Sequence, residues 1–476
     1  MNQTSGNALK LKVQTPVGQS PKVLFISGTQ LSLLLAFLAL GTVFVQALFE
    51  QSFTILGAYL LFGFLGVLWP RKLGTSAGIL YVTVFSVNVL VAIIIYYIYL
   101  NNYGTPYYYG GSDDTMFELL AARTANELEI WQYSGIRETI TNRYYEPAGY
   151  VYLVSLLYRL GESWGGFHTI LPRFLNAMSL GLISVVTYRI ATQNGVQKGI
   201  AFYTALIVGV LPIMTFNAAH TFRDVFVSLM AILTVYHWDH ALKKDTQRGY
   251  LIVCLVTAFT VRIMWEFRPM QAILLAILAG AAYIFLTQRR RSYFAPVHLL
   301  TIAMFAGVMI GVTIWQGWFT WGIERTTFYA DYYTEYRLEA SSGIANYIFS
   351  APLPISIVLR FIYGLISPLP FLGQRFEELY QGAGTIVHYF FLPFLLLGIP
   401  ISARSVYGRL WILAFALFYS ASLFTFTSRH IVIFLPYAAL ITAQGYIVYK
   451  RYSLAIALAL IWLAGMFGAI YIVLKM

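Results

Sequence analysis

The sequence predicts an all-α polytopic membrane protein, and three observations lead to that prediction. Of the 476 residues, 59% are hydrophobic and only 11% are charged, whereas soluble domains carry about 25% charged residues. The mean hydropathy is +0.69. Uncharged apolar runs long enough to cross a bilayer recur along the chain, most clearly at 24–49, 299–323 and 453–474. Such spans are helical, because lipid offers the backbone no other hydrogen-bond partner.

Basic clusters between the apolar runs predict the topology, since lysine and arginine beside short loops favour the cytoplasmic side. These clusters are Lys10/Lys12/Lys22, Arg71/Lys72, Lys243/Lys244/Arg248, Arg289/Arg290/Arg291, Arg404/Arg409 and Lys450/Arg451. Placing them inside predicts about 13 spans, with the N-terminus inside and the C-terminus outside. The predicted helices lie near 24–48, 52–69, 76–100, 172–191, 199–216, 225–241, 250–267, 269–287, 297–316, 384–400, 410–427, 431–449 and 453–474.

Two apolar segments do not fit a simple span. Residues 150–160 are too few to cross, so they predict a short juxtamembrane or re-entrant helix. The segment 353–372 is ambiguous, because Pro354, Pro368 and Pro370 interrupt it. The scheme treats 1–476 as a single transmembrane domain with two large external loops, 101–171 and 318–382.

The external face is predicted to be rich in arginine. Every lysine except Lys475 falls on the cytoplasmic side, whereas the external cations are almost all arginine. The planar fork of arginine suits phosphate and pyrophosphate better than the point charge of lysine does. We therefore expect the external face to bind an anionic ligand.

The first external loop concentrates the acidic residues. It holds eight of the 19 in the chain. They are Asp113, Asp114, Glu118, Glu127, Glu129, Glu138, Glu146 and Glu162. Acid–base or metal chemistry is therefore expected in this loop first.

The pair Asp113 and Asp114 follows 40 positions, 73–112, without a charged residue. The run 115–131 alternates apolar and polar residues as in an amphipathic helix on a membrane surface. One interpretation is that the two carboxylates cap this helix and offset its dipole. The other is catalytic: one carboxylate acts as a general base with a pKa raised by partial desolvation. Its neighbour then orients the acceptor or holds a metal ion.

Several segments resemble the GT-C superfamily of membrane glycosyltransferases, which includes protein O-mannosyltransferases and lipid A aminoarabinose transferases. Asp113-Asp114-x-x-Phe117-x-x-x-Ala121 is similar to the acidic pattern of their first external loop. "YYEPAGYVYLVSLLYRLGES" (144–163) resembles their proline-led juxtamembrane helix, and "LPRFLNAMSLGLISVVTYRIA" (171–191) the arginine-led helix after it. "HTFRDVFVSLMAILTVYHW" (220–238) is similar to the segment that carries a second acid. "SRHIVIFLPYAALITAQGY" (428–446) resembles a late helix of these enzymes and of O-antigen-type polymerases.

The resemblance implies a GT-C-like bundle with juxtamembrane helices in its first external loop. It implies transfer of a sugar from a polyprenyl-phosphate donor to a glycan, lipid or protein acceptor. The site would face the external, periplasmic side of a bacterial inner membrane. The catalytic candidates are Asp113, Asp114 and Asp224, of which Asp113 and Asp224 are also candidate ligands of a divalent metal, Mg or Mn. The candidates for substrate or phosphate binding are Arg223, Arg268, Arg429, His430, Arg173 and Glu146.

Other interpretations remain open. Asp224 can be an N-cap paired with its neighbour Arg223, and Arg262 can pair with Glu266 at i, i+4 spacing. The chain can instead be a polymerase of lipid-linked oligosaccharide repeats, or a non-enzymatic lipid or glycan transporter. Membrane lipids are expected partners. Nucleic acid is not, because topology and the external arginines account for the net charge of +12.

Overall fold

The computed structural model describes residues 28–108, 113–127, 148–244, 247–289, 324, 348, 350–366, 375–425 and 428–475. Every regular element in these residues is a helix. In chain order they are α1 (Gly28–Phe49), α2 (Phe53–Leu73), α3 (Thr75–Tyr103), α4 (Asp113–Glu127), α6 (Ala148–Glu162), α7 (Ile170–Gln193), α8 (Lys198–Val210), α9 (Pro212–Ala218), α10 (Asp224–Lys244), α11 (Gln247–Phe267), α12 (Pro269–Arg289), α16 (Leu353–Ile366), α17 (Phe376–Ser402), α18 (Val406–Thr425), α19 (Ser428–Tyr449), the 3-10 turn η1 (Lys450–Tyr452) and α20 (Ser453–Lys475).

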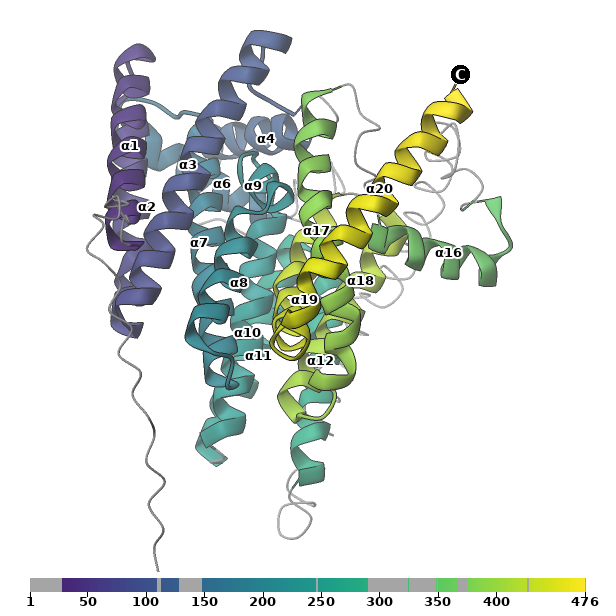
Figure 1. Cartoon of the computed structure of the whole chain (residues 1–476). Helices are drawn as coiled ribbons and strands as arrows, with labels where there is room; N and C mark the ends of the chain where they lie inside the picture. The colour runs from purple at the N-terminus through teal and green to yellow at the C-terminus, as the bar shows by residue number, and fades with distance from the viewer. Residues whose placement is uncertain are drawn as a thin grey trace, which may run out of the picture.

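Most of these helices run side by side in one bundle (Figure 1). Within the described residues, six helices are long and apolar enough to cross a membrane, and the bent pair α8–α9 would make a seventh. The predicted fold class, an all-α polytopic membrane protein, is therefore confirmed. The predicted span 297–316 lies outside the described residues, so the count of about 13 spans stays a prediction.

The core of the bundle surrounds α7. In the most apolar stretch of α7, 89% of the residues are buried, whereas in that of α1 only 28% are buried and the helix faces outward. Tyr81 on α3 links two helices of this core, because its hydroxyl donates a hydrogen bond of 2.8 Å to the carbonyl of Phe62 on α2. A side chain at Gly66 on α2 or Gly181 on α7 would overlap the Tyr81 ring. The two glycines thus permit the close approach of α2, α3 and α7.

The predicted span 199–216 is broken rather than continuous. It forms α8 and α9, whose axes differ by 50°. The break falls at Leu211, which has the extended backbone angles φ −59° and ψ 130°. Pro212 explains the correction, because a proline removes a helical hydrogen bond and disfavours the helical conformation of the residue before it.

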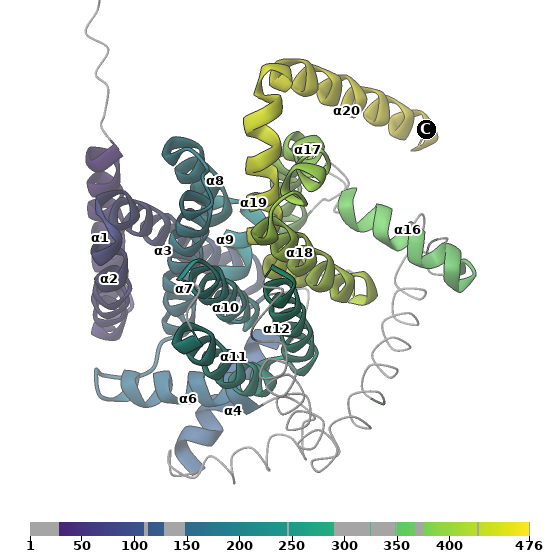
Figure 2. The ribbon, with the colours of Figure 1, turned by 90° about the horizontal axis from the view of Figure 1, so that it is seen from below.

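Three short helices form in segments where the sequence did not predict a simple membrane span. The expected short helix at 150–160 is present as α6, and the amphipathic run after Ser112 forms α4. These two helices pack against each other and lie across one end of the bundle (Figures 1 and 2). The third, α16, covers 14 residues of the ambiguous segment, about 21 Å of helix. That is shorter than the roughly 30 Å of a bilayer core.

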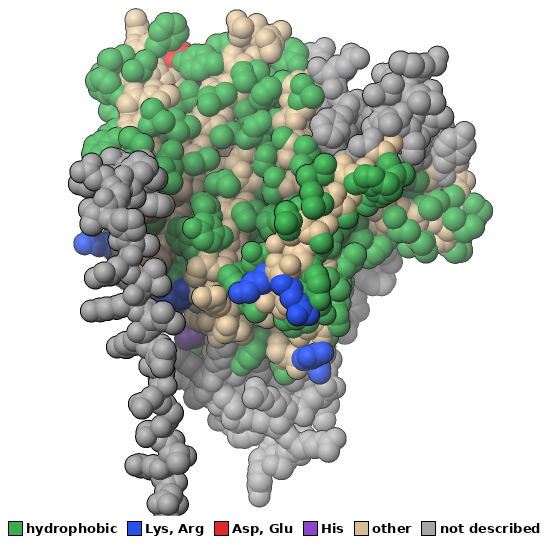
Figure 3. Space-filling model, viewed as in Figure 1, with side chains coloured by type: hydrophobic (Ala, Val, Ile, Leu, Met, Phe, Trp, Pro, Cys, Tyr) green, Lys and Arg blue, Asp and Glu red, His purple; other side chains and the backbone are tan. Residues whose placement is uncertain are grey.

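The two ends of the bundle differ in charge. Arg71, Lys72, Lys198, Lys450 and Arg451 are all exposed and lie at helix ends on the side away from α4 and α6, which we call the basic end. In Figure 3 the lysine and arginine side chains visible on this face lie in its lower half. The basic clusters at 71–72 and 450–451, which were predicted to share one side, therefore lie at the same end, and the side that this end faces stays a prediction.

Candidate active site

Asp113 begins α4 and faces the first turn of α19. Arg429 of that turn donates a hydrogen bond from Nη1 to Asp113 Oδ2. The side chain of Asp113 is 36% exposed and that of Arg429 is 21% exposed. The pair therefore joins two segments 316 positions apart at a site that solvent and ligands can reach.

Asp224 begins α10 and is fully buried. Arg268, between α11 and α12, brings Nη2 to 2.6 Å from Asp224 Oδ1. The contact is an ion pair, but its geometry is not that of a hydrogen bond. Within the described part of the chain, neither oxygen of the Asp224 carboxylate accepts a hydrogen bond. Arg268 Nη1 lies 2.8 Å from His430 Nε2. A guanidinium can only donate, so His430 accepts this hydrogen bond and carries no proton on Nε2.

Aromatic rings orient two arginines of the same region. The guanidinium of Arg429 lies 4.8 Å from the centre of the Phe222 ring, and that of Arg223 lies 5.2 Å from the centre of the Phe117 ring. Such cation–π contacts fix the plane of a guanidinium without neutralising its charge.

We call this group the charged cluster; its members are Asp113, Arg223, Asp224, Arg268, Arg429 and His430. Its three guanidinium groups outnumber its two carboxylates. An anion with several oxygens, such as a phosphate, suits a site of this kind.

The electrostatics of Asp113 differ from the sequence-based expectation. Burial alone would raise the pKa of Asp113, but the guanidinium of Arg429, with contributions from Arg223 and Arg268, lowers it below its usual value. The expected raised pKa is therefore wrong for Asp113 in this arrangement. The carboxylate is ionised at neutral pH for as long as Arg429 pairs with it.

Asp114 is fully buried on the other side of the first turn of α4. Its Oδ2 accepts a hydrogen bond of 2.8 Å from the Tyr108 N–H, and its Oδ1 accepts one of 3.1 Å from the Thr115 N–H. Burial raises the pKa of Asp114, although these amides partly offset the effect. Asp114 thus ties the preceding loop to the start of α4, much as a capping residue does.

Glu118, one helical turn later, joins three further segments. It accepts hydrogen bonds from the hydroxyls of Thr169 at 2.5 Å, Thr221 at 2.7 Å and Tyr107 at 3.0 Å. Burial raises the pKa of Glu118, and Arg173 is the nearby charge that opposes this rise.

Arg173 is itself fully buried, and its Nη2 donates a hydrogen bond of 2.5 Å to the Pro106 carbonyl. We call this group the buried polar layer; its members are Tyr107, Asp114, Glu118, Thr169, Arg173 and Thr221.

A hydrogen-bonded turn at 219–223 connects the buried polar layer to the charged cluster. Asn176 on α7 donates to the carbonyls of His220 and Phe222, each at 2.9 Å. His220 Nδ1 donates to the Phe216 carbonyl at 2.7 Å. Burial and the charge of Arg173 lower the pKa of His220 to about 3, so it is a neutral structural group. This turn directly precedes Arg223 and Asp224, and it fixes where α10 begins.

The structure sorts the predicted site residues into groups. Six of them form the charged cluster, whereas Asp114 and Arg173 belong to the buried polar layer. Glu146 lies outside the described residues. Sequence reasoning did not single out Glu118, although its i, i+4 spacing from Asp114 places both on one face of α4. The expected pairing of Arg262 with Glu266 is present at 2.5 Å.

The predicted metal ligands do not fit a cation in this arrangement. Asp113 and Asp224 each face a guanidinium, which would repel a divalent ion. Within the described ranges, no group of three or more His, Cys, Asp or Glu side chains is arranged to hold a metal.

No protein-family model matches the sequence, and no curated protein matches it. Among solved structures, the chain is similar to the archaeal oligosaccharyltransferase AglB from Archaeoglobus fulgidus, in complex with an inhibitory peptide and a dolichol-phosphate. The identity is 14% and the TM-score is 0.39, over 82% of this chain and 54% of that chain. This chain thus spans about half the length of that protein. A similarity of this degree carries no argument about activity, so the functional interpretation rests on the charged cluster.

Proposed function

We propose that this chain is a membrane glycosyltransferase that moves a sugar from a polyprenyl-phosphate carrier to a glycan, lipid or protein acceptor. The observation that carries the proposal is the charged cluster, in which arginines and aspartates from four separate segments meet. They meet at the end of the bundle opposite the basic end. We assign the chain to a bacterial inner membrane, with this end facing the periplasm.

In the proposed reaction, Arg268 and Arg429 bind the phosphate of the donor. The bond between the sugar C1 and the phosphate oxygen breaks, and C1 bonds to an oxygen or nitrogen of the acceptor. The carrier leaves as its phosphate anion, whose developing charge the guanidinium groups stabilise. The proton of the acceptor passes to the carboxylate of Asp113.

The ion pair of Asp113 couples donor binding to this proton transfer. A donor phosphate at Arg429 competes with Asp113 for the guanidinium. Once Asp113 loses that partner, the largest cause that lowers its pKa is gone while burial still raises the pKa, which makes Asp113 a better base. Asp224 keeps Arg268 in place through their contact of 2.6 Å. The base is thus prepared only when the donor is bound.

The direct test is to incubate the purified chain with a panel of polyprenyl-phosphate and polyprenyl-pyrophosphate glycans and candidate acceptors. Transfer of a single sugar unit from a polyprenyl-phosphate donor supports the proposal. Ladders of oligosaccharide repeats would overturn it in favour of a polymerase. No turnover with any donor, together with flux of a labelled lipid-linked glycan across vesicles, would overturn it in favour of a transporter.

The orientation has a separate test with introduced cysteines in a Cys254→Ser background, which removes the single cysteine of the chain. Asn126 is exposed on α4, and Lys198 is exposed at the basic end. An impermeant thiol reagent added to intact cells should label Asn126→Cys and spare Lys198→Cys. The reverse pattern would place the charged cluster in the cytoplasm. Asp224 is unsuitable for this measurement because it is buried.

A further inference from the structure

A large apolar cavity lies between α8, α17 and α19. Its volume is about 520 Å³, within the roughly 300–1,000 Å³ of sites for small organic ligands. Ile207, Leu211, Phe391, Leu395 and Ala439 are among its lining residues. Small residues of α19 leave the space open, while the bulkier side chains of α8 and α17 form the walls.

The cavity opens on the side of α8 and is closed at its back. Tyr203 on the outer face of α8 is 65% exposed, whereas Leu395 on α17 is 2% exposed. α8 has 13 residues and is about 20 Å long, more than half of the roughly 30 Å hydrocarbon core. The lining residues run from Gln197 to Leu211, so the cavity extends along the whole of α8 from the basic end.

One end of the cavity lies beside a group of cations. Gln197 and Ser453 line this end. Lys198 follows Gln197 directly, and Lys450 and Arg451 shortly precede Ser453. All three cations are exposed at the basic end of the bundle. A ligand whose apolar chain fills the cavity would thus hold its polar head among positive charges.

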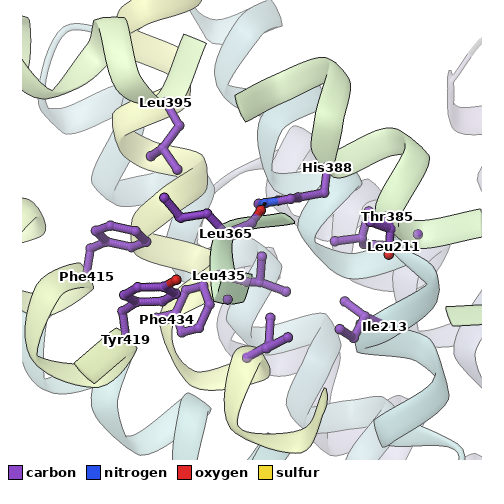
Figure 4. Close-up of a pocket in the computed structure, with 13 residues that line it drawn as sticks. Leu211, Ile213, Leu365, Thr385, His388, Leu395, Phe415, Tyr419, Phe434 and Leu435 are labelled. Carbon is purple, nitrogen blue, oxygen red and sulfur yellow. Dashed lines mark hydrogen bonds between the residues drawn. The ribbon is translucent and has the colours of Figure 1, made fainter. Parts of the chain in front are cut away.

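The other end of the cavity is almost closed. A second cavity of only about 20 Å³, room for about one water, continues toward α18 and the start of α19. The two cavities share Leu211, His388, Leu395 and Leu435. Figure 4 shows aromatic rings of α18 and α19 and the imidazole of His388 around this narrow space. At this end the open space therefore narrows to room for about one water before it reaches the start of α19, where Arg429 of the charged cluster lies.

From the closed inner end and the cationic outer end, we infer that the cavity is a binding site for an anionic phospholipid of the leaflet at the basic end. An acyl chain occupies the apolar space, and the phosphate of the headgroup meets Lys198, Lys450 and Arg451. Basic residues beside a membrane surface attract anionic headgroups. A peptide suits the cavity less well, because its backbone polar groups would lack partners there.

The test measures lipid retention by the purified full-length chain, with native mass spectrometry in detergent. The probes are phosphatidylglycerol and phosphatidylcholine with identical acyl chains. We expect one phosphatidylglycerol to be retained preferentially. Lys450→Ala/Arg451→Ala should weaken its binding by about fivefold for each cation removed. The matched control Arg71→Ala/Lys72→Ala removes the same charge at the same end, on α2, and should change the binding little.

A third variant tests the cavity itself. Ala439→Phe fills part of the apolar space and should weaken the binding of both lipids, with thermal unfolding as the check on folding. If that variant does not fold, the exposed charge variants decide the outcome. Equal retention of both lipids by the parent protein, or an equal loss in the α2 control, would overturn the inference. Displacement of phosphatidylglycerol by polyprenyl phosphate, molecule for molecule, would assign the cavity to the donor and also overturn it. No transfer reaction is measured, so failure here leaves the proposed function standing.

Discussion

The charged cluster and the buried polar layer hold carboxylates in different ways, although both begin in the first turn of α4. In the charged cluster, Asp113 pairs with a guanidinium and its pKa falls. In the buried polar layer, Asp114 and Glu118 accept hydrogen bonds from neutral amides and hydroxyls, and burial raises their pKa. The cluster is partly open to ligands, whereas Asp114 and Glu118 are closed off.

This difference in surroundings indicates which carboxylates hold segments of the chain in place and which one is free to take part in a reaction. A carboxylate surrounded by neutral donors fixes segments of the chain, because its partners cannot leave without a large loss. A carboxylate paired with one arginine at a partly exposed site contributes little to stability, and a phosphate can replace it. The adjacent residues Asp113 and Asp114 are therefore expected to respond differently to the same substitution.

The largest effect is expected at Asp113. Asp113→Asn should lower turnover by about 10²-fold or more, because an amide cannot take up a proton near neutral pH. The fold should be kept, since a partly exposed ion pair contributes little to stability. Turnover and thermal unfolding of the purified variant measure the two effects. Glu162→Gln breaks another partly exposed ion pair, with Arg159, and should leave turnover nearly unchanged. Parent-like turnover in Asp113→Asn would remove Asp113 from the reaction.

Asp114→Asn should instead destabilise the protein. The amide can accept only one of the two backbone hydrogen bonds, and its NH₂ group would face the other N–H. The expected loss is about 1–3 kcal/mol in the free energy of unfolding. Turnover per folded molecule should stay close to that of the parent. A stable Asp114→Asn variant with a 10²-fold slower reaction would show that the two carboxylates have the opposite roles.

Arg268→Lys and Arg429→Lys test the use of the guanidinium fork. Lysine keeps the charge but cannot make two parallel hydrogen bonds to a phosphate, so donor binding should weaken by about tenfold. Titration with a polyprenyl-phosphate donor measures the affinity. Arg262→Lys is the matched control, because Arg262 lies six residues before Arg268, on α11, and pairs with Glu266. Unchanged affinity in both site variants would return these arginines to a structural role.

The smallest effect is a pH dependence of stability that comes from the buried polar layer. Because burial raises the pKa of Glu118 above its unfolded value, the folded state favours the protonated form. That contribution is complete below about pH 4.3, the unfolded value, and is lost as pH rises through the folded pKa. A glutamine at position 118 does not titrate, so the Glu118→Gln variant does not lose stability in this way. The variant should therefore gain stability relative to the parent as pH rises, measured by thermal unfolding in detergent. A stability difference that does not change with pH would contradict this account.

The sequence predicts helices well in this chain because lipid enforces them. The apolar runs at 52–69 and 76–100 correspond to α2 and α3, and the break at Leu211 follows from a proline visible in the sequence. The members of the charged cluster could also be predicted from the sequence, since they lie where apolar runs begin or end. The lowered pKa of Asp113 could not be predicted from the sequence, because its cause is a residue 316 positions away. Likewise, the role of Glu118 depends on hydroxyls from other segments that only packing brings together.

The ion pairs of the charged cluster also determine which anions can bind there. Each of Arg429 and Arg268 already has a counter-ion from its own chain. Inorganic phosphate from the surroundings must therefore displace a carboxylate that is always present at high effective concentration. A lipid-linked phosphate has the same competitor, but it is confined to the membrane beside the site and brings further contacts through its sugar and carrier. Under the proposed function, the two aspartates would make the resting protein resistant to small free anions, and a donor would be selected partly because it is confined to the membrane.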